Sequence, residues 1–213
     1  MPADFEKQSY WHDRFASETK FEWLLSSEDF LPLIEPVLSQ LAPDTARILH
    51  LGFGTSDLQN HLRKRGFANV LNVDYEPLAE TRGRELELQA FGDVQMRYAV
   101  QDATQLHLGP DDKFDLVLDK STVDAVSCAG EAPLRRMAAR IRECVAGPDS
   151  VWVSLSYSAW RFDIDDLPFD VEILSKVLTP KLKPTDPDVF YYCYLLRPKR
   201  DAASARPPEV GNR

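Results

Sequence analysis

The sequence predicts an α/β domain built around a mostly parallel sheet. Apolar, strand-like runs alternate along the chain with amphipathic segments of about ten residues or more, as in βαβ units. Acidic residues stand at or just after the ends of three of these runs, where open parallel sheets bind their ligands. The 213 residues contain no internal repeat, so we expect one domain with appendages.

Each expected strand is a short, mainly apolar run bounded by turn residues. The last of them is rich in aromatic residues, follows a Pro-rich loop and is followed by no helix, so it can add as an antiparallel edge or a hairpin. The expected strands occupy 46–52, 69–74, 94–100, 114–119, 150–157 and 189–197.

The expected helices lie between the strands, which implies right-handed crossovers and parallel neighbours. Gly66 stops the first helix, and Pro77 occupies the first turn of the second. The third has apolar residues on one face and ends before a Gly-Pro pair. These helices are expected at 56–65, 77–91 and 133–145.

Composition excludes several classes of function. The formal charge of −9 argues against general affinity for nucleic acid, although it suits a basic protein partner. Charges interrupt the N-terminal residues and no stretch approaches roughly 18 apolar residues, so neither a signal peptide nor a membrane span is expected. No zinc-ligand or disulfide spacing relates the three cysteines, Cys128, Cys144 and Cys193. We therefore expect a cytoplasmic protein without a bound metal; the oligomeric state stays open.

A glycine-rich turn follows the first strand in LGFGTSD (51–57). Gly52 and Gly54 allow a tight turn and a close backbone approach to a ligand. The third glycine of a dinucleotide-binding turn is absent, because Asp57 occupies its place. An aspartate there repels a pyrophosphate, so the turn favours a cofactor without phosphates.

Carboxylates at the ends of the next strands suit the other parts of an adenosyl ligand. Asp74 follows Gly52 by 22 residues and can accept hydrogen bonds from ribose hydroxyls. Asp102 can accept one from an adenine amino group, and Asp119 ends the fourth strand. A dinucleotide dehydrogenase is the rival interpretation, but the chain lacks the Tyr-x-x-x-Lys pair of short-chain dehydrogenases. S-adenosylmethionine fits better.

These motifs resemble a known family. In order and spacing, ILHLGFGTSDL, NVDY, QDAT and FDLVLDKSTVDA are similar to the class I S-adenosylmethionine-dependent methyltransferases. More narrowly, YWHDRF, FEWL and DKSTVDA resemble the methyltransferases that modify lysines of translation elongation factor 1A. The resemblance covers about residues 8–126 and is thin in the C-terminal third.

The resemblance implies a Rossmann-like fold with a seven-stranded sheet, one strand of which is reversed. It also implies a helical cap at 1–45 over the cofactor site and a methyltransferase domain at 46–198. The C-terminal residues lose apolar periodicity and gain Pro, Ala and charge, which predicts a mobile tail at 199–213. The departures from the family pattern are His50, Phe53 and the His12-Asp13 pair, and no role follows for His12, Asp13 or His50.

The resemblance also implies which residues hold the cofactor. The N-terminal segment packs aromatic rings around it, the glycine turn lines its methionine side, and the strand ends bind ribose and adenine, with a lysine at the mouth. In that order, the residues implied are Trp11, Phe15, Trp23, Gly52, Gly54, Asp74, Tyr75, Asp102, Ala103 and Lys120.

A lysine acceptor must lose a proton before it can attack the methyl group. We expect Asp119 to orient the amine or accept the proton, with Asp124 as the second candidate. Lys120 then repels the cationic substrate or binds the cofactor carboxylate, although a local salt bridge between Asp119 and Lys120 is the simpler alternative. Tyr157 and Trp160 are expected to line the acceptor channel.

Two properties of the acceptor side stay open at this point. The acidic residues between 163 and 172 form a solvated loop or attract a basic protein surface. The predicted activity is S-adenosylmethionine-dependent methylation, with a protein lysine as the acceptor. The alternatives are a small-molecule methyltransferase and a non-catalytic binding module that keeps the fold.

Overall fold

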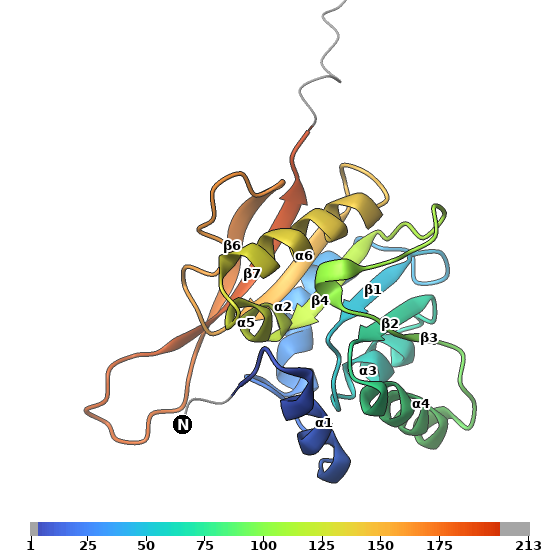
Figure 1. The fold of residues 1–213 in the computed structure, drawn as a ribbon, viewed down its shortest axis with the longest axis horizontal. Helices are drawn as coiled ribbons and strands as arrows, with labels where there is room; N and C mark the ends of the chain where they lie inside the picture. Colours follow the sequence, from blue (N-terminus) through green and yellow to red (C-terminus); the bar gives the residue numbers. More distant parts are fainter. Residues whose placement is uncertain (1–3, 201–213) are drawn as a thin grey trace, which may run out of the picture.

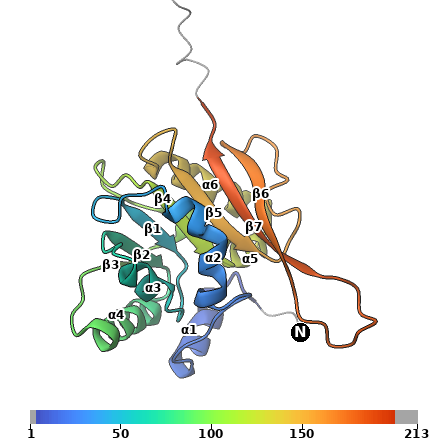
Figure 2. The ribbon, with the colours of Figure 1, turned by 180° about the vertical axis from the view of Figure 1, so that it is seen from behind.

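In the computed structural model, which describes residues 4–200, a seven-stranded sheet is covered by helices on both faces (Figures 1 and 2). The strand order is β3-β2-β1-β4-β5-β7-β6, with β1 to β5 parallel and β7 antiparallel to both of its neighbours. The predicted mixed sheet with one reversed strand is therefore confirmed. The strands are β1 (Ile48–Leu51), β2 (Val70–Asp74), β3 (Arg97–Val100), β4 (Leu116–Lys120), β5 (Val151–Ser156), β6 (Phe169–Leu178) and β7 (Phe190–Pro198).

The helices begin and end at recognisable signals. Ser26 caps α2 by accepting a hydrogen bond from the Asp29 amide, and Gly92, with a φ of 80°, ends α4. The helices are α1 (Gln8–Ser17), α2 (Ser27–Leu38), α3 (Leu58–Lys64), α4 (Pro77–Phe91), α5 (Thr122–Ser127) and α6 (Glu131–Cys144), with a 3₁₀ turn η1 (Ala103–Gln105). No helix among residues 4–200 is long and apolar enough to cross a membrane.

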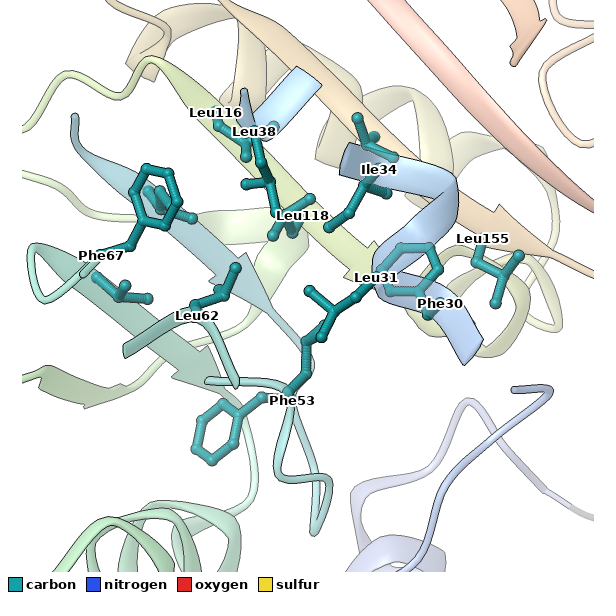
Figure 3. Packing of buried hydrophobic residues seen from close by; sticks show 14 of the residues in the cluster. Phe30, Leu31, Ile34, Leu38, Phe53, Leu62, Phe67, Leu116, Leu118 and Leu155 are labelled. Atoms are coloured by element: carbon teal, nitrogen blue, oxygen red, sulfur yellow. The ribbon is translucent and has the colours of Figure 1, made fainter. Parts of the chain in front are cut away.

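The sheet separates two cores because alternate residues of each strand point to opposite faces. On one face, Leu116 and Leu118 of β4 pack with α2 and α3, whose side chains meet in Figure 3. On the other face, Val117 of β4 packs with Trp152 and α6. Asp119 therefore points toward α5 and α6, while Lys120 points to the α2 face.

One strand was not predicted. β6 covers part of the segment in which the sequence placed only a loop, and it contains Asp170 and Glu172 of the acidic run. The interpretation of this part of the run as a loop is wrong. β6 is an edge strand with mostly exposed side chains, so it lacks the apolar run by which the other strands were found. The late strand β7 forms a hairpin with β6 and lies between β5 and β6.

The N-terminal residues divide into two parts. α2 belongs to the core, where Phe30, Leu31, Ile34 and Leu38 are almost completely buried. Residues 4–25, which we call the strap, contain α1 and lie beside the carboxyl ends of the strands (Figure 1). Of the tail expected at 199–213, only residues 199 and 200 lie within the described residues.

Candidate functional site

A cavity of about 510 Å³ lies at the carboxyl ends of the parallel strands. Its floor is the point where β1 lies between β2 and β4 and the strand order changes direction, the usual ligand position in such sheets. The strap covers it with the rings of Phe5, Trp11, Phe15, Phe21 and Trp23. Most of its other lining residues lie in the segments 52–56, 74–75, 101–104 and 120–129.

The two glycines of the turn after β1 are required by contacts within the cavity wall. Gly52 has a φ of 58°, and a Cβ there would lie 2.2 Å from Oγ1 of Thr122. That hydroxyl donates to the carbonyl of Leu51 at 2.9 Å, which ties the end of β1 to α5. A Cβ on Gly54 would lie 3.3 Å from the ring of Phe15. Glycine thus lets α5 and the strap pack closely against this turn.

Asp74 occupies the end of β2 and lines the cavity. Its two oxygens accept hydrogen bonds from the amides of Gly54 at 2.9 Å and Glu76 at 3.0 Å. Burial raises the pKa of this carboxyl to about 6. Each carboxylate oxygen has a second lone pair, so Asp74 can still accept from ligand hydroxyl groups.

Asp102 follows β3 and also lines the cavity. Its carboxylate accepts from the Thr104 amide at 2.7 Å and from the Gln105 side chain at 3.0 Å, which fixes the start of η1. Ala103 lines the cavity beside it, and Tyr75 lines it after β2. The strand ends from which the sequence predicted a ligand site therefore converge on one cavity.

Asp119 is one of two predicted site residues that do not line the cavity. It is completely buried and does not line the cavity. Its oxygens accept from the indole Nε1 of Trp152 at 2.8 Å and from the Val123 amide at 3.2 Å. Burial raises the pKa of its carboxyl to about 7. Because neighbouring residues of a strand point to opposite faces, the salt bridge between Asp119 and Lys120 that was the simpler alternative does not form.

Lys120 lines the cavity, but its ammonium group is directed at the strap. The Nζ atom donates to the carboxylate of Glu22 at 2.5 Å and to the carbonyls of Trp23 at 3.0 Å and Leu25 at 2.9 Å. Its three donors are thus all used within the protein. A cofactor carboxylate finds no free N–H on this lysine.

Of the three residues expected on the acceptor side, two line the cavity. Tyr157 does so, and so does Asp124, whose carboxylate accepts from the guanidinium of Arg161 at 2.8 Å and from the Tyr157 amide at 3.2 Å. Burial raises the pKa of Asp124. Trp160 does not line the cavity and is 77% exposed on the loop after β5.

Sequence reasoning missed Glu22 and left His50 without a role. Glu22 gave no signal beyond its place in FEWL, because its partner Lys120 lies 98 positions away. His50 lines the cavity, is buried, and its Nδ1 lies 3.1 Å from the amide oxygen of Asn72. Burial lowers the pKa of His50 to about 4, so the ring is neutral.

Among residues 4–200, no group of three His, Cys, Asp or Glu side chains could hold a metal ion.

Comparison with known proteins assigns the family. The chain is 58% identical to the methyltransferase srdJ of Neurospora crassa over 202 residues, which cover 93% of this chain and 86% of that protein. The chain belongs to the S-adenosylmethionine-dependent methyltransferases. No family model matches it.

Two further relatives carry more specific names. The methyltransferase is 34% identical to mouse EEF1A lysine methyltransferase 4 over 130 residues, which cover 60% of this chain and 48% of that protein. It is 33% identical to a Drosophila melanogaster eEF1A lysine and N-terminal methyltransferase homolog over 134 residues, 62% of this chain. The match spans only 19% of the Drosophila protein.

Solved structures agree on the fold. Magnesium protoporphyrin IX methyltransferase from Synechocystis, with bound S-adenosylmethionine, matches with a TM-score of 0.62 at 9% identity, covering 92% of this chain and 98% of that one. The N-methyltransferase NodS from Bradyrhizobium japonicum, in complex with S-adenosylhomocysteine, matches with a TM-score of 0.62 at 14% identity, covering 89% and 99%. The cofactor of the methyltransferase follows from its family and is S-adenosylmethionine.

The residues of the cavity fit this cofactor. The aromatic strap suits a sulfonium, which an aromatic face attracts, and the ring centroids of Trp11 and Trp23 are 5.7 Å apart. Asp74 keeps free lone pairs for two hydroxyls, and no lining residue supplies a P-loop for phosphates. The enclosed volume lies in the range of small-molecule sites.

Proposed function

We propose that this methyltransferase transfers a methyl group to a lysine side chain of a basic protein, with elongation factor 1A as the model substrate. The observation that carries the proposal is the identity of 33–34% to proteins named as eEF1A lysine methyltransferases. Support also comes from the motifs YWHDRF, FEWL and DKSTVDA, whose segments meet at one cavity. A cytoplasmic location, which microscopy of the tagged protein would test, is part of the proposal.

In the proposed site, different residues of the cavity wall contact the ribose, the adenine and the methionine part of the cofactor. Asp74 binds the ribose hydroxyls, and Asp102 with the backbone at Ala103 holds the adenine edge beside Tyr75. The glycine turn borders the methionine side, and the rings of Trp11, Phe15 and Trp23 cover the cofactor from the strap. When bound, S-adenosylmethionine supplies an electrophilic methyl group, and the protein mainly positions the partners and excludes water.

The acceptor must arrive as a neutral amine. With an ordinary pKa near 10.4, only about 0.1% of a lysine is neutral at cytosolic pH, a free-energy cost of roughly 4 kcal/mol. Removal from water in the cavity disfavours the charged form and so lowers the pKa of the acceptor lysine. Asp119 cannot take the proton directly, because its carboxylate is completely buried and does not line the cavity.

Asp124 acts as a positioning residue in this proposal. Its carboxylate accepts bonds from Ser121, Ser156, Arg161 and the Tyr157 amide, so its role is to hold the loop after β5 beside the cavity. Tyr157 and the neighbouring Trp160 then face the incoming acceptor segment. Water at the open side of the cavity accepts the proton.

The experiment that tests the proposal is labelling with tritiated S-adenosylmethionine. The purified enzyme is incubated with a lysate and with purified elongation factor 1A, and the products are separated by size. We expect label in a protein band that disappears when the acceptor lysine is replaced by arginine. Label found only in small molecules would replace the proposal by the small-molecule alternative. The Asp74→Ala variant, which lacks the carboxylate proposed to bind the ribose, gives the background level of labelling.

A further inference from the structure

We infer that Glu22 and Lys120 form a buried clasp that holds the strap over the cofactor cavity and positions Trp23 in its wall. The two residues are positioning residues for methyl transfer, and neither exchanges a proton with the acceptor. The inference concerns the cofactor side of the cavity, so it does not depend on the proposed lysine substrate.

The first support is the use of all three donors of Lys120. One bond reaches the Glu22 carboxylate, and the other two reach the carbonyls of Trp23 and Leu25. The lysine side chain is 5% exposed and that of Glu22 is 17% exposed. A cation with every donor directed at one turn of another segment fixes the position of that turn.

The second support is the other side of Glu22. Its carboxylate also accepts from the hydroxyls of Ser27 at 2.9 Å and Ser56 at 3.0 Å, and from the Asp57 amide at 3.2 Å. Ser56 and Asp57 follow the glycine turn, and Lys120 ends β4. One carboxylate therefore joins the strap to both walls between which the cavity opens.

The third support is the backbone that the clasp holds. Leu24 has a φ of 63°, a left-handed backbone conformation that residues other than glycine rarely adopt. The Leu25 amide donates to the Trp23 carbonyl at 2.8 Å, which closes a tight turn around Leu24. Such a tight turn persists only where its surroundings hold it in place. The Lys120 ammonium bonds the carbonyls on both sides of Leu24, and both Trp23 and Leu24 line the cavity.

The other ion pairs between the strap and the rest of the described chain are more exposed. The histidine of the His12–Glu76 pair is 60% exposed, and the lysine of the Lys20–Asp57 pair is 52% exposed. Water and salt weaken such pairs, whereas a buried pair keeps its strength. A cofactor that leaves past the strap must therefore first open the Glu22–Lys120 clasp.

The experiment measures the rate at which S-adenosylhomocysteine leaves the full-length protein. Tryptophan fluorescence reports the release in a stopped-flow instrument, because Trp11 and Trp23 belong to the strap. We expect Glu22→Gln and Lys120→Met to raise the dissociation rate about tenfold or more. Glu22→Asp, which keeps the charge on a shorter side chain, should lie between these variants and the wild type.

Two controls separate the clasp from general destabilisation. Lys7→Met removes an exposed pair that lies wholly within the strap, Lys7–Asp4, and should leave the dissociation rate unchanged. Met137→Ala opens the core beneath α6 at a residue that does not line the cavity, and it should lower the unfolding temperature without changing the rate.

The inference is overturned if folded Glu22→Gln and Lys120→Met release S-adenosylhomocysteine at the rate of the wild type or of Met137→Ala. If neither variant folds, hydrogen exchange of the wild type decides. The peptide covering residues 18–26 should then exchange as slowly as β4, and rapid exchange there with β4 protected would overturn the inference.

Discussion

The indole N–H of Trp152 donates to the carboxylate of Asp119 at 2.8 Å, on the face of the sheet opposite the strap. This bond joins β4 to β5 beneath α5 and α6, where the Val123 amide donates to the other oxygen. The sequence pattern predicts Asp119 at the ligand site because it ends a strand. In the structure its carboxylate instead forms hydrogen bonds within the core.

The Asp119 carboxyl makes stability depend on pH. Its pKa is about 7 in the folded protein and near 3.9 in the unfolded chain, so the folded state binds the proton more tightly. The stabilisation is complete below about pH 4 and is lost as the pH rises through 7, by about 2–3 kcal/mol between pH 5 and 8. Urea unfolding should show that this difference between pH 5 and pH 8 shrinks in Asp119→Asn.

The comparison of wild type and variant isolates Asp119, because Asp74, with a pKa of about 6, titrates in both proteins. Parallel stability profiles of the two proteins would contradict the prediction. The affinity for S-adenosylhomocysteine should be unchanged in Asp119→Asn, since residue 119 does not line the cavity.

Asp74→Ala should weaken the binding of S-adenosylhomocysteine by about 100-fold or more. Two charge-assisted hydrogen bonds to ribose hydroxyls are worth about 1.5–3 kcal/mol each, and each 1.4 kcal/mol is tenfold in affinity. Calorimetry measures the affinity, with Asp149→Ala on an exposed loop as the matched control. An affinity equal to that of the control would refute the ribose role.

The fold could be predicted because four of its parallel strands are buried and the aromatic β7 is largely buried, so these strands read as apolar runs. β1, β2, β4 and β5 are buried at every position. β6 was not predicted from the sequence, because Phe169 is its only buried residue. An exposed edge strand carries almost no hydrophobic pattern from which it could be found.

Only those residues of the candidate site that directly follow a strand could be predicted from the sequence. Asp74 and Asp102 line the cavity as expected, because each follows its strand. The sequence could not predict which of Asp119 and Lys120 lines the cavity. Both faces of β4 are buried, and the sequence does not tell which face meets the strap. Glu22 depends on a contact across 98 positions, which no local pattern reports.

Gly52→Ala should lower the free energy of unfolding by about 2–5 kcal/mol. Alanine at a φ of 58° is strained by about 1–2 kcal/mol, and its Cβ would lie 2.2 Å from Thr122 Oγ1, an overpacking that typically costs about 1–3 kcal/mol. Urea unfolding measures the change.

The matched control for this substitution is Gly92→Ala. Gly92 has a φ of 80° but nothing within 4 Å of a Cβ, so only the backbone strain remains. Equal losses of stability in the two variants would show that the contact with Thr122 does not matter.

Trp160→Ala tests whether the loop after β5 meets a protein acceptor. The indole is 77% exposed, yet the loop is held, since Arg161 pairs with Asp124 and the Tyr194 hydroxyl donates to the Ser158 carbonyl at 2.7 Å. A large aromatic side chain presented on a fixed loop is typical of an interface hot spot. The unfolding temperature and the affinity for S-adenosylhomocysteine should not change, because Trp160 does not line the cavity.

Methylation of the protein acceptor, in contrast, should show a KM about fivefold or more higher in Trp160→Ala, the loss of roughly 1 kcal/mol of binding. Leu182→Ala provides the matched control, because this residue is 96% exposed in the loop between β6 and β7. Initial rates at varied acceptor concentration measure KM for both variants. If Trp160→Ala and Leu182→Ala behave alike, the acceptor does not contact the indole. A small molecule that enters the cavity past Tyr157 would give that result.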